Sequence, residues 1–582
     1  MEEKIGTFDY ETDKWIDVKL IGFFDGVEYR TFTDTKKFLS HIMRDKYKGY
    51  KFYAHNGGKF DFLFLMDEIL KRGILKELTP RQGSVIIIRL SNGRTNITLA
   101  DSLALLPDSL EKLSHGFGVA HAKGKIDFKG GEKFSAKNKK HLQYLYDDCV
   151  GLYEVLQKFF DSEFVVKPKF TIASQALDTF KQKFLDFDLQ RLELADENLI
   201  RTRFYSGGRV EVFKGEGKNI HSYDVNSLYP YAMLSEMPCG MYKNTRTFHP
   251  DKIGFYKVRI ENTPQWVVSP LLCKVQKGNS EQFENYYVNG AGDYYLSSAT
   301  LLMLKKDYGI KFKVDYGFVF PNREYIFNDY VNTFYKIKAA NKGNSLYYIA
   351  KYMLNSLYGK LGQTRWTETI QFRSKDTEDF VSFDDYYGLV MTLKESRSKF
   401  ILPYLACYIT ELARLHHFKL MREVENEIFY CDTDSIFCTT RKLDAEVKKG
   451  IGRLSYKGCY SGIFLAPKTY AIRNAHEIGI TFKGFSPDNF RYRDFERAAS
   501  GKIVLSESRT RPMSFVECTR IEEMRAEGRE SKREKYIVHE RGRYLKVVES
   551  TKKVSTVYDK RVILPDSRHR FVSVPYNYDE VN

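Results

Sequence analysis

Residues 222–230 read Ser-Tyr-Asp-Val-Asn-Ser-Leu-Tyr-Pro, a short run with the character of a β-strand that delivers Asp224 at its end. We expect the chain to break there into a turn closed by Pro230. A carboxylate at a strand end is a natural ligand for a divalent cation. By itself such an aspartate is more often a surface or capping residue, so the interpretation needs further acids.

Residues 428–438 supply two of them. They read Ile-Phe-Tyr-Cys-Asp-Thr-Asp-Ser-Ile-Phe-Cys, which predicts a hairpin with Asp432 and Asp434 in a polar tip between two apolar strands. Two like charges at a tight turn repel one another, and a divalent cation relieves that repulsion. The alternative is an ordinary Asp-rich turn.

A predicted helix over 345–361 lies between these two stretches. Its apolar residues recur at helical spacing, at Leu346, Ile349, Met353 and Leu357. The opposite side carries a cation, an amide and a phenol, at Lys351, Asn355 and Tyr358. Such a face suits a nucleoside triphosphate, with the ammonium on phosphate and the ring near the base or sugar. A plain amphipathic helix is the alternative.

In chain order, these stretches resemble motifs A, B and C of the family B DNA polymerases: Asp-x-x-Ser-Leu-Tyr-Pro, Lys-x-x-x-Asn-Ser-x-Tyr-Gly and Tyr-x-Asp-Thr-Asp-Ser. The resemblance implies a palm in which Asp224 and Asp434 are the main ligands of two metal ions, with Asp432 in support. It also implies nucleotide-binding roles for four residues: Lys351 on the triphosphate, Tyr229 and Tyr358 around the nucleotide, and Asn355 beside them. Selection against ribose maps to Tyr229.

Because these ligands are all oxygen, Mg²⁺ is the expected ion, with two per active site and Mn²⁺ as a substitute. One ion would activate the primer 3'-hydroxyl and the other would stabilise the leaving pyrophosphate.

The N-terminal part holds a second set of acids, in Phe8-Asp-Tyr-Glu-Thr12, His55-Asn-Gly-Gly-Lys-Phe-Asp61 and Tyr144-Leu-Tyr-Asp-Asp148. Alternation in a strand places Asp9 and Glu11 on one face, where they can share a cation. Asp-x-Glu alone occurs widely without a metal. Together, the three stretches resemble motifs Exo I, Exo II and Exo III of the proofreading domain of the same family, which has an RNase H-like fold.

This second resemblance implies that Asp9, Glu11, Asp61 and Asp148 bind two metal ions and that Tyr144 orients the attacking water. It assigns the frayed primer end to Thr12, Asn56 and Phe60. Three further residues resemble single-strand contacts of the family: Ser109, Leu110 and Lys123.

The predicted fold is therefore a multidomain one of mixed α/β and α+β class, with an RNase H-like exonuclease domain before a right-hand palm, fingers and thumb. We expect the exonuclease domain over 1–190, with helices over 61–72 and 139–160 and strands over 84–90 and 95–100. The polymerase domain takes 191–582, divided into palm (about 205–250 and 395–488), an insertion (about 251–322), fingers (about 323–362), a second insertion (about 363–394) and a thumb or C-terminal lobe (about 489–582).

The chain of 582 residues carries a net charge of +17, which favours a polyanionic partner, here template and primer DNA. An anionic membrane is the rival partner, but no stretch approaches the roughly 18 apolar residues of a spanning helix.

The eight cysteines contain no Cys-x-x-Cys pair, so neither zinc nor disulfides are indicated. We expect a soluble, intracellular protein, in the host cytoplasm if a virus or plasmid encodes it.

Three features resemble the protein-primed branch of phages and linear plasmids. Tyr205-Ser-Gly-Gly208 looks like the branch's Tyr-x-Gly-Gly linker, in which Tyr205, Gly207 and Gly208 contact the template. The two insertions lie where this branch has its terminal-protein regions. Exo I begins so early that no room remains for the N-terminal domain of larger members.

The branch implies dNTP substrates, strand displacement on a linear viral or plasmid genome, and a separate terminal protein as primer. The chain would then be a monomer or a heterodimer with that protein. Lys468-Thr-Tyr470 resembles the family's Lys-x-Tyr motif, which places Lys468 and Tyr470 near the primer terminus. Lys338 is expected to contact primer or nucleotide.

Three alternatives stay open at this point: a family B polymerase primed by RNA or DNA, an exonuclease with a decayed polymerase half, and a non-catalytic basic protein that binds nucleic acid.

Overall fold

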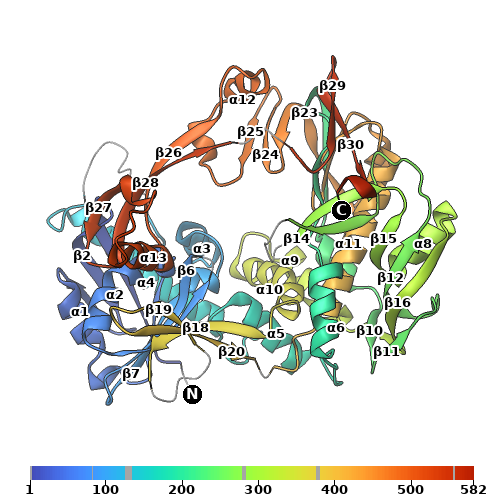
Figure 1. Cartoon of the computed structure of the whole chain (residues 1–582). Coiled ribbons are helices and arrows are strands. Elements are labelled where there is room, and N and C mark those ends of the chain that lie inside the picture. Colours follow the sequence, from blue (N-terminus) through green and yellow to red (C-terminus); the bar gives the residue numbers. More distant parts are fainter. Residues whose placement is uncertain are drawn as a thin grey trace.

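The computed structural model describes residues 3–81, 83–124, 134–277, 283–374, 380–396, 398–554 and 558–581. Its elements are arranged around a ring (Figure 1). The N-terminal sheet and its helices, in blue, lie on one side, and a second large sheet lies on the other. Within the described residues, no helix combines the length and apolar character that crossing a membrane requires.

The N-terminal sheet has ten strands in the order β19-β20-β18-β5-β6-β7-β4-β1-β2-β3. Seven come from the N-terminal part: β1 Ile5–Asp13, β2 Asp17–Phe24, β3 Tyr29–Phe32, β4 Lys51–Ala54, β5 Leu75–Arg81, β6 Ser84–Ser91 and β7 Asn96–Asp101. The predicted strands over 84–90 and 95–100 are confirmed as β6 and β7. Strand β1 pairs antiparallel with β2 and parallel with β4, so it lies inside the sheet with both edges bonded.

The other three strands come from the segment predicted as the second insertion: β18 Trp366–Phe372, β19 Phe380–Asp384 and β20 Leu389–Glu395. Ile370 pairs with Leu78 of β5, and both side chains are fully buried. The segment therefore extends the N-terminal sheet, although it lies far away in sequence.

Two long helices pack on this sheet. The predictions over 61–72 and 139–160 are confirmed as α2 Asp61–Lys71 and α4 Lys139–Phe160. Helix α4 contacts both β1 and β2. Its buried residues, which include Leu145, Cys149 and Leu152, follow helical spacing, so one face of α4 is fixed against the strand that carries Asp9 and Glu11.

The second large sheet has seven strands in the order β25-β24-β23-β9-β22-β21-β8. Their bounds are β8 Val210–Val212, β9 Glu216–Val225, β21 Ile428–Asp432, β22 Ser435–Cys438, β23 Leu454–Ala466, β24 Thr469–Arg473 and β25 Ile478–Phe482. The hairpin predicted over 428–438 is confirmed as β21 and β22.

Helices α5 Ile172–Lys183, α9 Asn328–Ala340, α10 Ser345–Leu361 and α11 Pro403–Glu423 form a further group, in which α10 contacts the other three. The predicted helix over 345–361 is confirmed as α10, which packs between α5 and α9. The turn expected after this strand is confirmed at Asn226 and Ser227, but Pro230 does not close it, because a short helix, α7 Leu228–Met233, starts before Pro230. Pro230 lies in the first turn of α7, where a missing N–H costs no intrahelical hydrogen bond.

The first insertion contributes three strands to a four-stranded sheet in the order β11-β16-β12-β15, which β11 joins from the segment predicted as palm, and α8 Ser298–Tyr308 packs against this sheet. Its strands are β11 Lys243–Thr245, β12 Ile253–Ile260, β15 Gly292–Ser297 and β16 Phe312–Phe320. A hairpin of β13 Leu272–Gln276 and β14 Phe283–Asn289 adds the short β31 Tyr576–Asn577 from the C-terminal end.

After β25 and α12 Tyr492–Ala499, the chain crosses to the N-terminal side (Figure 1). There it forms a unit over residues 506–553, which we call the C-terminal subdomain: β26 Ser506–Pro512, α13 Phe515–Ala526, β27 Ile537–Arg541 and β28 Leu545–Lys553. Its apolar residues belong to the same core cluster as α2 and β18, through Phe515, Cys518, Ile521 and Tyr544. The C-terminal subdomain is thus packed into the N-terminal unit.

The chain then returns to the second sheet through β29 Val562–Asp566 and β30 Arg570–Val574. Arg561 anchors this return. Its fully buried guanidinium lies 3.1 Å from the carboxylate of Glu211 and donates to the carbonyl oxygen of Val267 at 2.8 Å. The C-terminal stretch therefore connects the two large sheets twice.

Candidate active sites

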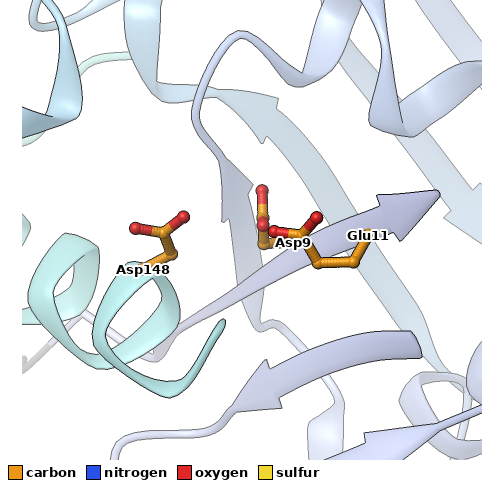
Figure 2. A group of neighbouring side chains, drawn as sticks. All are labelled: Asp9, Glu11 and Asp148. Carbon is orange, nitrogen blue, oxygen red and sulfur yellow. The ribbon is translucent and has the colours of Figure 1, made fainter. Parts of the chain in front are cut away.

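Three carboxylates meet where α4 crosses β1. Asp9 and Glu11 project from one face of the strand, and Asp148 reaches them from the helix (Figure 2). One oxygen of each lies within 4.8 Å of the other two. In the part of the chain that the structure describes, this is the single acidic group that satisfies that condition, and its all-oxygen donor set fits a hard divalent cation.

The electrostatics of this group also fit a cation. Burial, together with the charges of Asp9 and Asp148, raises the pKa of Glu11 to about 8. Burial likewise raises the pKa of Asp148 to about 7, although Lys123 opposes the shift by donating from Nζ to Asp148 Oδ2 at 2.6 Å. Neighbouring carboxylates repel one another when they ionise, and a bound cation stabilises their ionised forms.

Asp61 lies beside this group rather than within it. It begins α2, is buried, and accepts a hydrogen bond from the Tyr10 N–H at 3.0 Å. Burial and the charge of Asp9 hold its pKa well above the ordinary value. Tyr144 lies one helical turn before Asp148, and burial raises the pKa of its phenol to about 12.

The residues predicted to hold the primer end lie on several elements of the N-terminal part. Thr12 lies near the end of β1, and Asn56 adopts a left-handed backbone (φ 63°) just before α2. The ring of Phe60 lies edge-on to Trp15, with centroids 5.7 Å apart. Ser109 caps α3 Leu110–Gly116 by accepting from the Lys112 N–H at 3.3 Å, and Leu110 is buried. The Ser109 hydroxyl keeps its own proton to donate.

The second acidic set lies in the seven-stranded sheet, with Asp224 on β9, Asp432 at the end of β21 and Asp434 in the turn before β22. Asp224 of β9 stands opposite Ser435 of β22, and the Val225 N–H donates to the carbonyl oxygen of Asp434 at 2.8 Å. Thr433, between the two hairpin aspartates, has a φ of 60°. The tight turn thereby brings Asp434 beside Asp224. Burial raises the pKa of Asp434 to about 6, with further contributions from the charges of Asp224 and Asp432.

Two lysines neutralise part of this set. Lys468 Nζ lies 2.7 Å from both carboxylate oxygens of Asp432, and Lys457 Nζ lies 3.3 Å from Asp224. The sequence analysis placed Lys468 at the primer terminus and did not identify Lys457. No sequence signal marks Lys457, because its place depends on β23 pairing with β9. Tyr470, also assigned to the primer, packs against Tyr430 with ring centroids 5.0 Å apart.

The predicted nucleotide face of α10 borders these acids. The rings of Tyr229 and Tyr358 stack with centroids 4.4 Å apart at 25°. Lys338 donates from Nζ to Ser227 Oγ at 3.0 Å. Burial and the nearby charge of Lys351 lower the pKa of Lys338, so the two ammonium groups lie close to each other. Asn355 is exposed on the same helix. Two adjacent cations favour a polyphosphate.

The Tyr205–Gly208 segment supports the hairpin tip. A Cβ on Gly208 would lie 2.6 Å from Thr433 Oγ1, so only glycine allows this approach. Arg414 fixes the segment by donating to the carbonyl oxygens of Ser206, at 2.6 Å, and Gly207, at 3.0 Å. Gly207 is exposed, and a Cβ added there would meet no other atom within 4 Å. Tyr205 packs against Gly362.

Comparison with known proteins gives consistent matches. A family model described as "DNA polymerase type B, organellar and viral" matches residues 41–140 and 132–450. A probable DNA polymerase of Neurospora intermedia is 28% identical over 75% of this chain, which spans only 53% of that protein. The DNA-directed DNA polymerase of Enterobacteria phage PRD1 is 28% identical over 76% of this chain and 78% of its own.

Among solved structures, phi29 DNA polymerase complexed with primer-template DNA and incoming nucleotide substrates superposes with a TM-score of 0.73. The match covers 95% of this chain and 100% of that chain at 20% identity. This likeness confirms the predicted fold class, a multidomain fold of mixed α/β class.

Proposed function

The chain belongs to the organellar and viral type B DNA polymerases, and from that membership we propose that it is a DNA-directed DNA polymerase with a 3'–5' proofreading exonuclease. The observation that carries the proposal is the presence of two separate acidic sites. One lies beside the cationic face of α10, and the other lies between β1 and α4. Polymerisation is assigned to the first site and hydrolysis to the second.

At the polymerase site, Asp224 and Asp434 would hold two Mg²⁺ ions, or Mn²⁺ in their place, with Asp432 in support. Bound divalent cations supply charge stabilisation at the attacking and leaving oxygens of such a displacement. Lys351 and Lys338 bind the triphosphate, while the Tyr229 and Tyr358 stack bounds the nucleotide. Tyr229 then stands where a ribose 2'-hydroxyl would meet its ring.

The Lys468 ammonium neutralises Asp432, and its side chain can also turn to a primer phosphate. Lys457 pairs with Asp224 in the same way. Both side chains are about half exposed, so exchanging one anionic partner for another costs little desolvation.

At the exonuclease site, Asp9, Glu11, Asp61 and Asp148 are the metal-binding set, and Lys123 fixes the orientation of Asp148. Tyr144 stays protonated at neutral pH because its pKa is about 12, so its phenol can donate a hydrogen bond to the attacking water. Divalent metal is thus the proposed cofactor of both sites, and the cluster of Asp9, Glu11 and Asp148 supports this for the exonuclease site.

Several finer features belong to the same proposal. The likeness to the PRD1 and phi29 polymerases supports protein-primed replication of a linear viral or plasmid genome with strand displacement, in a host cytoplasm. Primer-template DNA and incoming nucleotides, present in the phi29 complex, are the proposed ligands, and a separate terminal protein is the proposed primer.

The test compares wild type with Asp224→Ala and Asp9→Ala on a primed single-stranded circle with Mg²⁺. Asp224→Ala should abolish extension and keep primer degradation, and Asp9→Ala should do the reverse. The exposed Asp307→Ala, on α8, is the matched control and should keep both activities. Products longer than one circle would support strand displacement. A wild type that neither extends nor degrades primers would reject the proposal.

A further inference from the structure

One face of helix α4 holds the segment over residues 117–124, which follows α3. Gly151, Glu154 and Lys158 contact this segment, at positions i, i+3 and i+7 of the helix. Asp148 lies one turn before Gly151 and contacts the same segment through Lys123. The row of contacts therefore ends at one of the proposed exonuclease acids.

The far end of the row fixes the start of the segment. Lys158 donates from Nζ to the carbonyl oxygens of Phe117, at 2.9 Å, and Gly118, at 2.8 Å. A Cβ added to Gly151 would overlap the carbonyl oxygen of His121. The helix and the segment thus approach each other too closely for a side chain at this position.

Glu154 holds His121 with both of its carboxylate oxygens. Oε2 accepts from the His121 N–H at 3.1 Å, and Oε1 lies 2.6 Å from Nδ1 of the imidazole. The Glu154 side chain is only 26% exposed, so water competes little for these contacts. One carboxylate therefore fixes both the main chain and the ring of His121.

Lys123 lies two residues after His121 and is held from the other side by α3. Its N–H donates to Ser114 Oγ at 3.0 Å, and Ser114 is fully buried. Its ammonium donates to Asp148 Oδ2 at 2.6 Å. The position of this ammonium thus depends on the grip of α3 and on that of Glu154.

The orientation of Asp148 matters because its two oxygens have different surroundings. Oδ2 accepts from Lys123, whereas Oδ1 is buried and has no hydrogen-bond partner among the residues that the structure describes. The carboxylate points toward Asp9 and Glu11 (Figure 2). With Lys123 on Oδ2, Oδ1 is left for a shared cation, and a displaced lysine would let the carboxylate rotate.

We propose that Glu154 is a positioning residue of the exonuclease, which acts through His121 and Lys123 to fix the orientation of Asp148. The inference rests on the proposed exonuclease. It extends that site along α4 to a carboxylate in the second turn after Asp148, which holds the protein segment rather than a metal ion.

The test measures degradation of a 5'-labelled oligothymidylate with saturating Mg²⁺ and excess enzyme. Glu154→Ala should lower the rate about tenfold, as expected for a residue that orients a metal ligand. Glu154→Gln keeps an oxygen that accepts from the His121 N–H and should recover most of the loss. Extension of a matched primer should stay within about twofold of wild type in both variants, because the polymerase acids lie on other elements.

A double substitution separates this role from a general loosening of the fold. Lys123→Met removes the link to Asp148, so adding Glu154→Ala to it should lower the rate by less than about twofold. A general loosening would instead multiply the two losses. Glu163→Ala, which removes an exposed carboxylate just after α4, is the matched control and should degrade the oligothymidylate at the wild-type rate.

Amide hydrogen exchange tests the grip without relying on activity. Peptides that cover residues 117–124 should exchange faster in Glu154→Ala than in wild type, because the contacts at His121 are lost. The same peptides should be unchanged in Glu163→Ala.

Two results would overturn the role of Glu154: wild-type degradation by Glu154→Ala, or a tenfold loss that persists in the Lys123→Met background. A wild type that does not degrade the oligothymidylate would instead overturn the proposed exonuclease, while the exchange of residues 117–124 still shows whether Glu154 holds the segment. Thermal unfolding of each variant separates these outcomes from a loss of folded protein.

Discussion

Arg543 and Asp384, 159 residues apart, form a two-pronged ion pair in which Arg543 Nε and Nη2 each donate to one Asp384 oxygen at 2.8 Å. Asp384 is fully buried in β19, and Arg543 precedes β28 in the C-terminal subdomain. The Arg543 N–H also donates to Asp67 of α2 at 3.0 Å. One residue thus joins the C-terminal subdomain to the second insertion and to the N-terminal unit.

Removing this guanidinium should destabilise the protein strongly. Arg543→Ala leaves the carboxylate of Asp384 buried without its cation, which costs about 3–5 kcal/mol in comparable buried pairs. Asp384→Ala should cost less, because Arg543 keeps its ion pair with Glu522 at 3.1 Å. Urea denaturation followed by tryptophan fluorescence gives both values. Equal losses, or a loss below about 1 kcal/mol for Arg543→Ala, would contradict the buried-charge explanation.

Gly208→Ala should slow polymerisation and leave primer degradation intact. Its Cβ would lie 2.6 Å from Thr433 Oγ1, so the turn that carries Asp432 and Asp434 must shift. Displacing catalytic groups by about 1 Å can cost on the order of 100-fold in rate. Single-nucleotide incorporation measures the effect. Gly207→Ala meets open space and should lose less activity; an equal loss would mean that crowding at Thr433 is not the cause.

The two activities should respond differently to pH when Mg²⁺ is limiting. Cations bind the ionised carboxylates, so affinity rises as pH passes the metal-free pKa values. These are about 7 for Asp148 and about 8 for Glu11, but about 6 for Asp434. Between pH 6.5 and 8.5, the Mg²⁺ requirement of degradation should therefore fall more than that of extension. Parallel Mg²⁺ titrations of both activities test this expectation.

Protein stability supplies an independent check of the same shifts. Folding raises the pKa of Glu11 to about 8 and that of Asp148 to about 7. The stability that these two groups contribute is fully present below their pKa values in the unfolded chain, and it is lost as pH rises to 7 and 8. Metal-free protein should unfold at a lower temperature at pH 9 than at pH 6. Mg²⁺ should reduce the difference, and a reversed pH trend would contradict the assigned direction.

Tyr229→Val should admit ribonucleotides. The Tyr229 ring is held by its stack on Tyr358, with centroids 4.4 Å apart, which would keep it in place against a 2'-hydroxyl under the proposed role. Its removal should reduce the preference for dNTP over rNTP, expressed as a ratio of kcat/KM, by about 10–200-fold. Tyr231→Ala, an exposed tyrosine two residues on, is the control. Unchanged discrimination in Tyr229→Val would remove this residue from sugar selection.

The sequence predicted local features well. Helix α10 has the predicted bounds, and the hairpin holds Asp432 and Asp434 at its tip, because helical spacing and short apolar strands are visible in neighbouring residues. The acids of both sites were identified as motifs, and the structure brings Asp9, Glu11 and Asp148 together.

Long-range pairing could not be predicted in this way. The contact of Ile370 with Leu78 depends on which strand edge is free in the folded chain, and a single sequence does not encode that choice locally. The ion pairs of Lys457 and Lys468 have the same origin. The C-terminal subdomain shows only a basic composition in sequence, whereas its packing depends on Phe515 and Tyr544 entering a core built by α2.

The two crossings of the C-terminal stretch limit the modularity of this protein. Cutting the chain near residue 190 would not release an autonomous nuclease, because Ile370, Leu389, Phe515 and Tyr544 complete its core from the other half of the sequence. Truncation at β26 would uncover the same apolar surface. The segments behind the two proposed activities therefore share a core, so neither activity could be moved to another scaffold as one continuous stretch of chain.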